Sequence, residues 1–116
     1  MKKAYCVATC TTCQRILKDS DLIKKGYTYQ NIKEDKITPQ QLDEMKDMIG
    51  SYEALFSRRA LKYKAMGLKD KKLTEKDYRD LILQEYTFLK RPVIISGKKI
   101  YSGSEKKTVA EVIKLK

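Results

Sequence analysis

The residues best suited to chemistry are Cys10 and Cys13, which Thr11 and Thr12 separate near the start of this 116-residue chain. An alternating strand pattern precedes them and a helical pattern follows, so Cys10 falls where a strand becomes a helix. Free N–H groups and the positive end of the helix dipole favour a thiolate there, which predicts a lowered pKa for Cys10. Cys13 lies one turn further on the same face, within reach of a disulfide. The pattern predicts that Cys10 attacks and that Cys13 resolves.

Two other interpretations of the cysteines stay open. One is that Cys10 and Cys13 are incidental buried cysteines. The other adds Cys6, because Cys6-x3-Cys10-x2-Cys13 is the spacing with which radical enzymes hold an iron–sulfur cluster with S-adenosylmethionine. Those enzymes need a far larger barrel, and Cys6 is expected on the core side of a strand, so we expect no metal. The chain has no histidine, which excludes Cys-His nucleophile pairs.

Arginine and proline side chains further along the chain are candidates to support the cysteines. Arg91-Pro92 precedes an apolar strand, and a cis bond before Pro92 would turn backbone groups toward a neighbouring site. Taken alone, however, Pro92 is typical of an ordinary edge strand. Arg58-Arg59 falls on a predicted helix amid mixed charge, where alone it indicates a solvated face.

The composition indicates one basic domain without a membrane segment. Lysine and arginine number 26 against 15 acidic residues, which gives a net charge of +11 and suits solubility and the attraction of anions. No nucleic-acid motif accompanies this charge. No apolar run approaches the roughly 20 residues of a membrane helix, and the apolar stretch at the start is too short for a signal peptide. Three cysteines within 13 residues are not a secreted disulfide framework, so we expect a cytoplasmic protein.

The elements that position these residues follow the order β-α-β, then three helices, then β-β-α. The first three elements are a strand over 3–8, a helix over about 12–24 ended by Gly26, and a strand over 27–32. Because a helix connects the two strands, we expect them to pair in parallel. In the helix over 12–24, Ile23 is expected to face inward. Three further helices are predicted: one from a capping box at Thr38 to Gly50, one from Ser51 to Gly67, and one from Thr74 through 85–86. The remaining elements are a strand over 91–96, a tight turn at 97–98, a strand over 99–102 and a helix opened by 103–104. This order predicts an α/β fold with a mixed four-stranded sheet.

Three segments together carry a resemblance to a known family. They are Cys10-Thr11-Thr12-Cys13 after the first strand, Ser57-Arg58-Arg59 in the helical segment, and Lys90-Arg91-Pro92-Val93-Ile94 before a hairpin. With Ile100-Tyr101-Ser102-Gly103 before the last helix, they resemble the arsenate reductase (ArsC)/Spx family over essentially the whole chain. The resemblance implies a single thioredoxin-like domain over 1–116, with an all-helical insertion at about 38–87.

The resemblance also implies roles for individual residues. Cys10 matches the nucleophile, and Cys13 matches the second cysteine of Spx-like members, where arsenate reductases usually have serine. Arg91 matches the arginine before the family's cis proline. The predicted catalytic residues are Cys10, Cys13, Arg59 and Arg91, and the predicted substrate-binding residues are Thr11, Thr12, Arg58 and Pro92.

Two positions depart from the family pattern. Gln14 follows the second cysteine where members often have arginine, and Ser102 aligns with a third oxyanion-binding arginine of the arsenate reductases.

By resemblance, the expected activity is a thiol-dependent, arsenate reductase-like oxidation–reduction of a small oxyanion or disulfide. No bound cofactor is expected, and glutathione with glutaredoxin, or thioredoxin, would supply electrons. The alternative is an Spx-like transcription regulator, in which the disulfide switches binding to the C-terminal domain of the RNA polymerase α subunit. We expect a monomer in either case.

Overall fold

The computed structural model describes residues 2–115, which group into two compact units. The sheet unit comprises residues up to 35 and from 91 onward, and the helical unit comprises 36–90. The strands are β1 (Lys2–Cys6), β2 (Thr28–Asn31), β3 (Val93–Ser96) and β4 (Lys99–Ser102). The α-helices are α1 (Thr11–Ser20), α2 (Pro39–Ile49), α3 (Leu61–Ala65), α4 (Glu75–Gln84) and α5 (Lys106–Ile113). Short 3₁₀ helices are η1 (Glu53–Leu55), η2 (Leu68–Asp70) and η3 (Tyr86–Phe88).

None of the described helices has the length and apolar content needed to cross a membrane.

The sheet is mixed and has the strand order β2-β1-β3-β4. β1 and β2 are parallel, as the intervening α1 predicts, whereas β3 is antiparallel to both β1 and β4. Tyr5 pairs with Val93, so the same register continued by one residue brings Pro92 beside Cys6. This pairing joins the two ends of the chain where β1 leads toward Cys10. The four-stranded α/β fold is therefore as predicted from the sequence.

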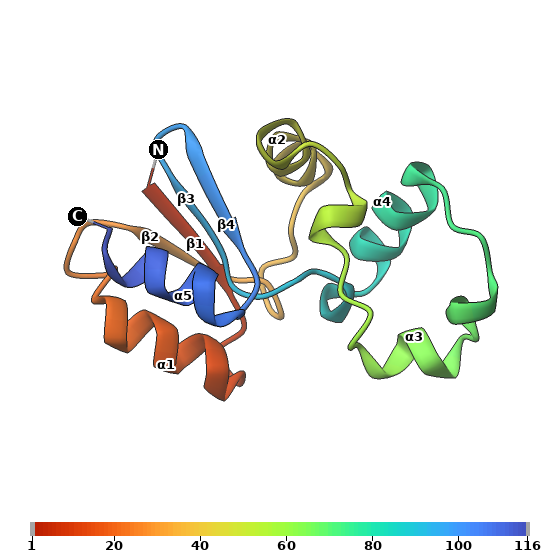
Figure 1. The fold of residues 1–116 in the computed structure, drawn as a ribbon, viewed down its shortest axis with the longest axis horizontal. Coiled ribbons are helices and arrows are strands. Elements are labelled where there is room, and N and C mark those ends of the chain that lie inside the picture. Colours follow the sequence, from red (N-terminus) through yellow and green to blue (C-terminus); the bar gives the residue numbers. More distant parts are fainter. Residues whose placement is uncertain (1, 116) are drawn as a thin grey trace. The chain divides into compact units, whose positions relative to one another are not determined.

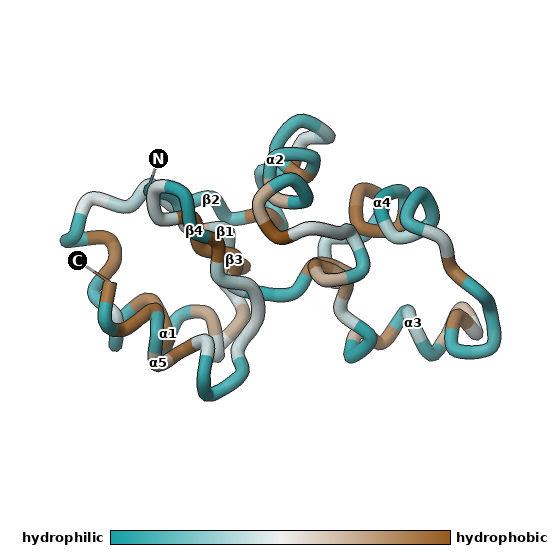
Figure 2. Tube along the Cα trace, turned by 45° about the horizontal axis from the view of Figure 1, so that its top comes forward, coloured by the Kyte–Doolittle hydropathy of each residue, from teal (hydrophilic) through white to brown (hydrophobic). Residues whose placement is uncertain are grey.

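Helices α1 and α5 lie side by side against one face of the sheet (Figure 1). Their buried faces meet alternate residues of the central strands, because side chains of a strand alternate between its two faces. In Figure 2 strand β3 is drawn mainly in hydrophobic colours. The buried members of this core are Ala4, Cys6, Cys13, Ile16, Leu17, Leu22, Tyr27, Ile94 and Val112. Two of the three cysteines are thus part of the packed core.

The helical unit begins with a capped helix. At α2, Gln41 N donates to Thr38 Oγ1 at 3.1 Å, and Thr38 N donates to Gln41 Oε1 at 3.1 Å. Pro39 occupies the first turn, and Gly50 ends the helix with a left-handed φ of 109°. This confirms the predicted capping box and the predicted helix end.

An aromatic cluster forms the centre of this unit. The Phe56 ring stacks on Phe88 at 5.1 Å between centroids and lies 4.9 Å from the ring of Tyr78. Phe56 is extended and forms an isolated antiparallel bridge with Leu89, while Ser57 N donates to Phe88 O at 2.6 Å. The single helix predicted from Ser51 to Gly67 is therefore wrong, because this pairing interrupts it. Arg58 and Arg59 lie in the resulting turn rather than on a helix.

Two other helix boundaries differ from the predictions. Helix α1 ends at Ser20, because Asp21 adopts a left-handed φ of 56°. Gly26 instead closes a following turn, in which Tyr27 N donates to Leu22 O at 3.1 Å. Leu22 is consequently buried, and Ile23, expected to face inward, is 54% exposed. Helix α4 ends at Gln84, so the predicted continuation through 85–86 is wrong.

Replacing the cap of α2 tests this local geometry. Thr38→Ala should lower the free energy of unfolding by about 1 kcal/mol, because the N–H of Gln41 loses its acceptor. Urea unfolding measures the difference. Thr38→Ser, which keeps the hydroxyl, and Gln40→Ala, an exposed change within the same helix, should both stay close to the parent. Equal stability of Thr38→Ala and the parent would contradict the capping assignment.

Candidate functional site

A short turn between β1 and α1 sets the position of Cys10. Cys10 N donates to Val7 O at 3.0 Å, which folds the chain back after the strand. Ala8 N donates to the side-chain oxygen of Asn31 at 3.2 Å, so the end of β2 holds the turn from the side. Gln14 Nε2 donates to Val7 O at 3.3 Å from the first turn of α1. Asn31 was not among the predicted site residues, although its place at the end of the neighbouring parallel strand was a usable signal.

Cys10 is the N-cap of α1, with φ −85° and ψ 110°. Its side chain makes no capping hydrogen bond, and the first turn contains no acidic residue. The first N–H groups of α1 have no partners within the helix, since an α-helix leaves its first four donors unpaired. The sulfur of Cys10 and any anion bound beside it therefore meet the positive end of the helix dipole.

The three cysteines differ sharply in access to solvent. Cys6 and Cys13 have no exposed surface, whereas Cys10 is partly exposed and packs on the edge of the same core. All three are free thiols in this structure. Of the three cysteines, Cys10 is therefore the one that a molecule approaching from solvent can reach.

Hydrogen bonds converge on the sulfur of Cys13. A hydrogen bond from the Cys6 thiol is the largest influence and, with the backbone N–H of Val7 and the Cys10 thiol, lowers the pKa of Cys13. Burial opposes this, and the positive charge of Arg91 assists it. The pKa of Cys13 falls from 9.0 to about 6, so Cys13 is mainly a thiolate at neutral pH. Cys13, for which a resolving role is predicted, is thus the thiol whose charged form is favoured.

Cys6 therefore belongs to the site as well as to the core. Its thiol donates to Cys13, and this hydrogen bond, together with burial, raises the pKa of Cys6 far above its ordinary value. The sequence placed Cys6 correctly on the core side of β1 but did not assign it to the site. The signal was present, because a strand that ends at Cys6 and leads directly into the helix of Cys13 brings the two side chains together.

Arg91 and Pro92 join the cysteines from the other end of the chain. The Arg91-Pro92 peptide bond is cis, as predicted, and Pro92 is buried. Pro92 O accepts a hydrogen bond from Gly103 N at 2.9 Å, which ties the start of β3 to the end of β4. The charge of Arg91 acts on Cys13. The sheet unit thus brings Cys10, Cys13 and the Arg91-Pro92 segment into one neighbourhood.

The other predicted residues are placed as follows. Thr11 is exposed and Thr12 half-buried in the first turn of α1. Arg58, in the helical unit, donates to Glu53 at 3.4 Å and to the hydroxyl of Tyr78 at 3.2 Å. Arg59 beside it is exposed and forms no ion pair within residues 2–115. Of the two arginines, Arg59 has the side chain that is not already held by neighbours.

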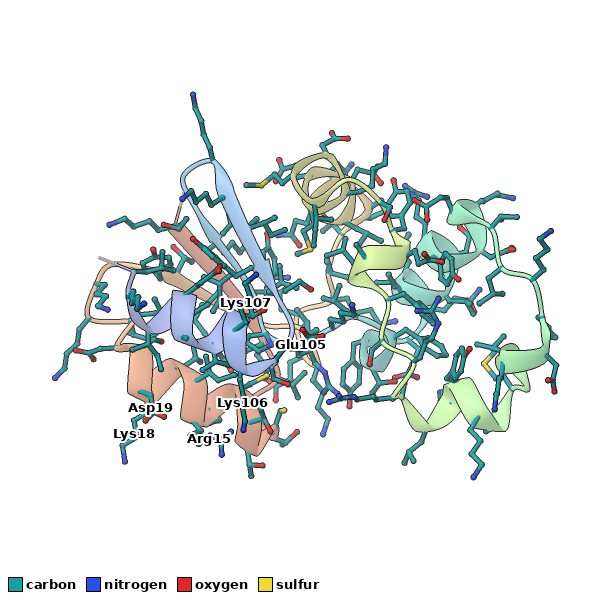
Figure 3. The ribbon with its side chains drawn as sticks, viewed as in Figure 1. Arg15, Lys18, Asp19, Glu105, Lys106 and Lys107 are labelled. Atoms are coloured by element: carbon teal, nitrogen blue, oxygen red, sulfur yellow. The ribbon has the colours of Figure 1, made fainter. Side chains whose placement is uncertain are left out.

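The surface beside α1 is rich in charged side chains. Figure 3 labels Arg15, Lys18 and Asp19 on α1, and Glu105, Lys106 and Lys107 at the start of α5, all of them exposed. The cationic members outnumber the acidic ones, so the local field favours anions. No group of three or more acidic, cysteine or histidine side chains in the described part of the chain is arranged to hold a metal ion.

The charge on Cys13 has a measurable pH signature. Its pKa in the folded state, about 6, lies below the ordinary 9.0, so its thiolate contributes stability that is fully present above pH 9. That contribution declines as pH falls and is lost below about 6. Ultraviolet thiolate absorbance of reduced Cys10→Ser should show a transition near pH 6 that is absent from the Cys10→Ser, Cys13→Ser double variant. A first thiolate transition near pH 9 would contradict the arrangement.

Comparisons with known proteins agree with this fold. The model of the ArsC family matches residues 5–112. Arsenate reductase from Vibrio cholerae superposes with a TM-score of 0.78 at 15% identity, covering 96% of this chain and 98% of its own. An arsenate reductase (ArsC) related protein from Brucella melitensis gives 0.70 at 19% identity, with 98% and 95% covered. SACOL0876 from Staphylococcus aureus COL gives 0.74 at 27% identity, with 96% and 97% covered.

No curated protein matches the sequence. The family match nevertheless spans nearly the whole chain, and the solved structures share its thioredoxin-like fold along nearly their full lengths. The chain belongs to the ArsC family.

Proposed function

We propose that the protein is a thiol-dependent oxidoreductase that reduces a small oxyanion, with arsenate as the first candidate, or a disulfide. Membership of the ArsC family and the likeness to arsenate reductases support this class. The observation that carries the proposal is the pairing of a partly exposed Cys10 with a buried Cys13, whose pKa is lowered to about 6. One sulfur is open to substrate and the other is charged and ready to resolve.

The first step is attack by Cys10 Sγ on the substrate. The Cys10 thiol donates a hydrogen bond to Cys13, so its proton passes along that bond to Cys13 as the new sulfur bond forms. With arsenate, Cys10 bonds to arsenic, and the departing hydroxyl takes up the proton that Cys13 received and leaves as water. With a disulfide, Cys10 bonds to one sulfur and the other leaves as a thiolate. The first turn of α1 and the guanidinium of Arg91 stabilise the negative charge of the substrate.

The second step is resolution by Cys13. Cys13 without that proton is again a thiolate, which its hydrogen bonds favour, and it attacks Cys10 Sγ. A Cys10–Cys13 disulfide forms, and the electron pair of the broken bond leaves with arsenic as arsenite, or with the second sulfur as a thiolate. Two thiols are oxidised while the substrate gains two electrons. An external thiol donor then reduces the disulfide to the dithiol. The donor is either glutathione with glutaredoxin, or thioredoxin.

Serine variants separate the two steps. Cys10→Ser should reduce turnover of arsenate to the background rate with either donor, because no sulfur remains within reach of substrate. Cys13→Ser should retain attack but accumulate a mixed disulfide between Cys10 and glutathione, detectable by mass spectrometry. Ala110→Ser, an exposed change on α5, controls for the introduction of serine. Turnover by Cys10→Ser equal to that of the parent would overturn the proposal.

The same assay separates the enzyme from a regulator. A redox switch also needs Cys10 and Cys13, and the charged Cys13 favours formation of their disulfide. Absence of turnover with both donors, together with redox-dependent capture of the RNA polymerase α C-terminal domain, would support the regulator and contradict the enzyme. Turnover with either donor would support the enzyme.

Arg91 should contribute to oxyanion binding beyond its charge. Arg91→Lys keeps a cation near Cys13 but cannot form two parallel hydrogen bonds to an oxyanion, so we expect KM for arsenate to rise about 10- to 100-fold. Steady-state kinetics measure this change. Lys98→Ala, which removes an exposed cation from the β3–β4 turn, should leave KM unchanged. Equal KM for Arg91→Lys and the parent would show that Arg91 does not bind the oxyanion through paired hydrogen bonds.

A further inference from the structure

Cys6 is the buried thiol for which the predicted roles have no use. It lies at the end of β1 with no exposed surface, in the core cluster that also contains Cys13. An ordinary core cysteine contacts only apolar groups. Cys6 instead shares this buried cluster with another thiol, that of Cys13. A hydrogen bond from Cys6 is the largest influence on the pKa of Cys13 and lowers it, ahead of Val7, Cys10 and Arg91. This places the sulfur of Cys13 between two thiols.

The backbone keeps this arrangement in place. Cys6 is paired on one side with Asn31 in β2, and Ile32 N donates to Cys6 O at 2.9 Å. Continuation of the β1–β3 register sets Pro92 on its other side. Cys13 is anchored in the first turn of α1, whose buried face packs on the same core. Both side chains are fully buried, so the two thiols lie in the same core when the site is reduced.

We propose that Cys6 is a positioning residue that sets how oxidising the Cys10–Cys13 couple is, by donating a hydrogen bond to Cys13 only when the couple is reduced. In the disulfide, Cys13 carries no charge and is a far weaker acceptor. The hydrogen bond therefore stabilises the dithiol form more than the disulfide form. Stabilisation of the reduced form makes a couple more oxidising. The inference rests on the proposed use of Cys10 and Cys13 as a redox pair.

No covalent change at Cys6 is required. Cys6 keeps its proton and its sulfur throughout, and electrons pass only among Cys10, Cys13, substrate and donor. Its burial and its bond to Cys13 raise its own pKa, so it remains a thiol and a donor at neutral pH. Cys6 should therefore resist alkylation in the folded protein.

The test compares variants that remove the donor with one that keeps it. Cys6→Ala and Cys6→Val remove the S–H, and Val fills the space if Ala destabilises the fold. Cys6→Ser keeps a hydroxyl donor. Ile16→Val removes a methylene from the same core without touching a thiol and is the matched control. The pKa of Cys13 is measured by titrating each variant in the Cys10→Ser background, where Cys13 is the responding thiol. The reduction potential is measured by equilibrating each variant with glutathione buffers in the background that retains Cys10 and Cys13.

In Cys6→Ala and Cys6→Val we expect the pKa of Cys13 to rise from about 6 toward 9.0. At pH 7 the equilibrium should then shift toward the disulfide by up to about tenfold, or about 30 mV to more negative potential. Cys6→Ser and Ile16→Val should stay close to the parent. An unchanged pKa and potential in both donor-free variants, or equal shifts in Ile16→Val, would overturn the proposal. Both measurements need no substrate, so loss of arsenate turnover would refute the proposed function without affecting this result.

Discussion

The buried sulfur of Cys13 is the point to which the sheet unit is organised. It receives hydrogen bonds from the Cys6 thiol, the Val7 N–H and the Cys10 thiol, and the charge of Arg91 acts in the same direction. Burial alone would raise the pKa of a thiol, because it removes water from the charged form. Here the donors outweigh burial, and a thiolate is stable where solvent does not reach. A buried thiolate that lost these hydrogen bonds would be strongly destabilising, so the groups that donate them must be held rigidly.

The fold supplies that rigidity through short connections between paired strands. β1 delivers Cys6 and Val7, and the turn after it is closed by the Cys10 N–H and by the side chains of Asn31 and Gln14. Antiparallel β3 brings the Arg91-Pro92 segment to the same end of β1 from a position more than 80 residues later. Cys10 remains at the helix start with partial exposure. The sulfur of Cys10 is thereby accessible and that of Cys13 is charged, as the proposed attack and resolution require.

Local signals predicted most of this arrangement. The strand-to-helix transition at Cys10, the capping box at Thr38 and the proline before β3 each rest on residues close in sequence, and all three features are present. The predictions failed where distant residues decide. Phe56 is extended because it pairs with Leu89, which no periodicity near residue 56 reveals, and Asp21 ends α1 early by adopting a left-handed conformation. No role was predicted for Cys6, because its place on the core side of β1 accounts for a buried cysteine without reference to Cys13 beside it in the core.

The central claim is that Cys10 and Cys13 form the redox couple while Cys6 remains a thiol. Mass mapping of the disulfide tests it most directly. Reduced protein is treated with oxidised glutathione, free thiols are alkylated before and after unfolding, and the peptides are identified by mass. The account predicts a Cys10–Cys13 disulfide, with Cys6 alkylated only after unfolding. Glutathione retained on Cys10, or a disulfide that includes Cys6, would contradict it.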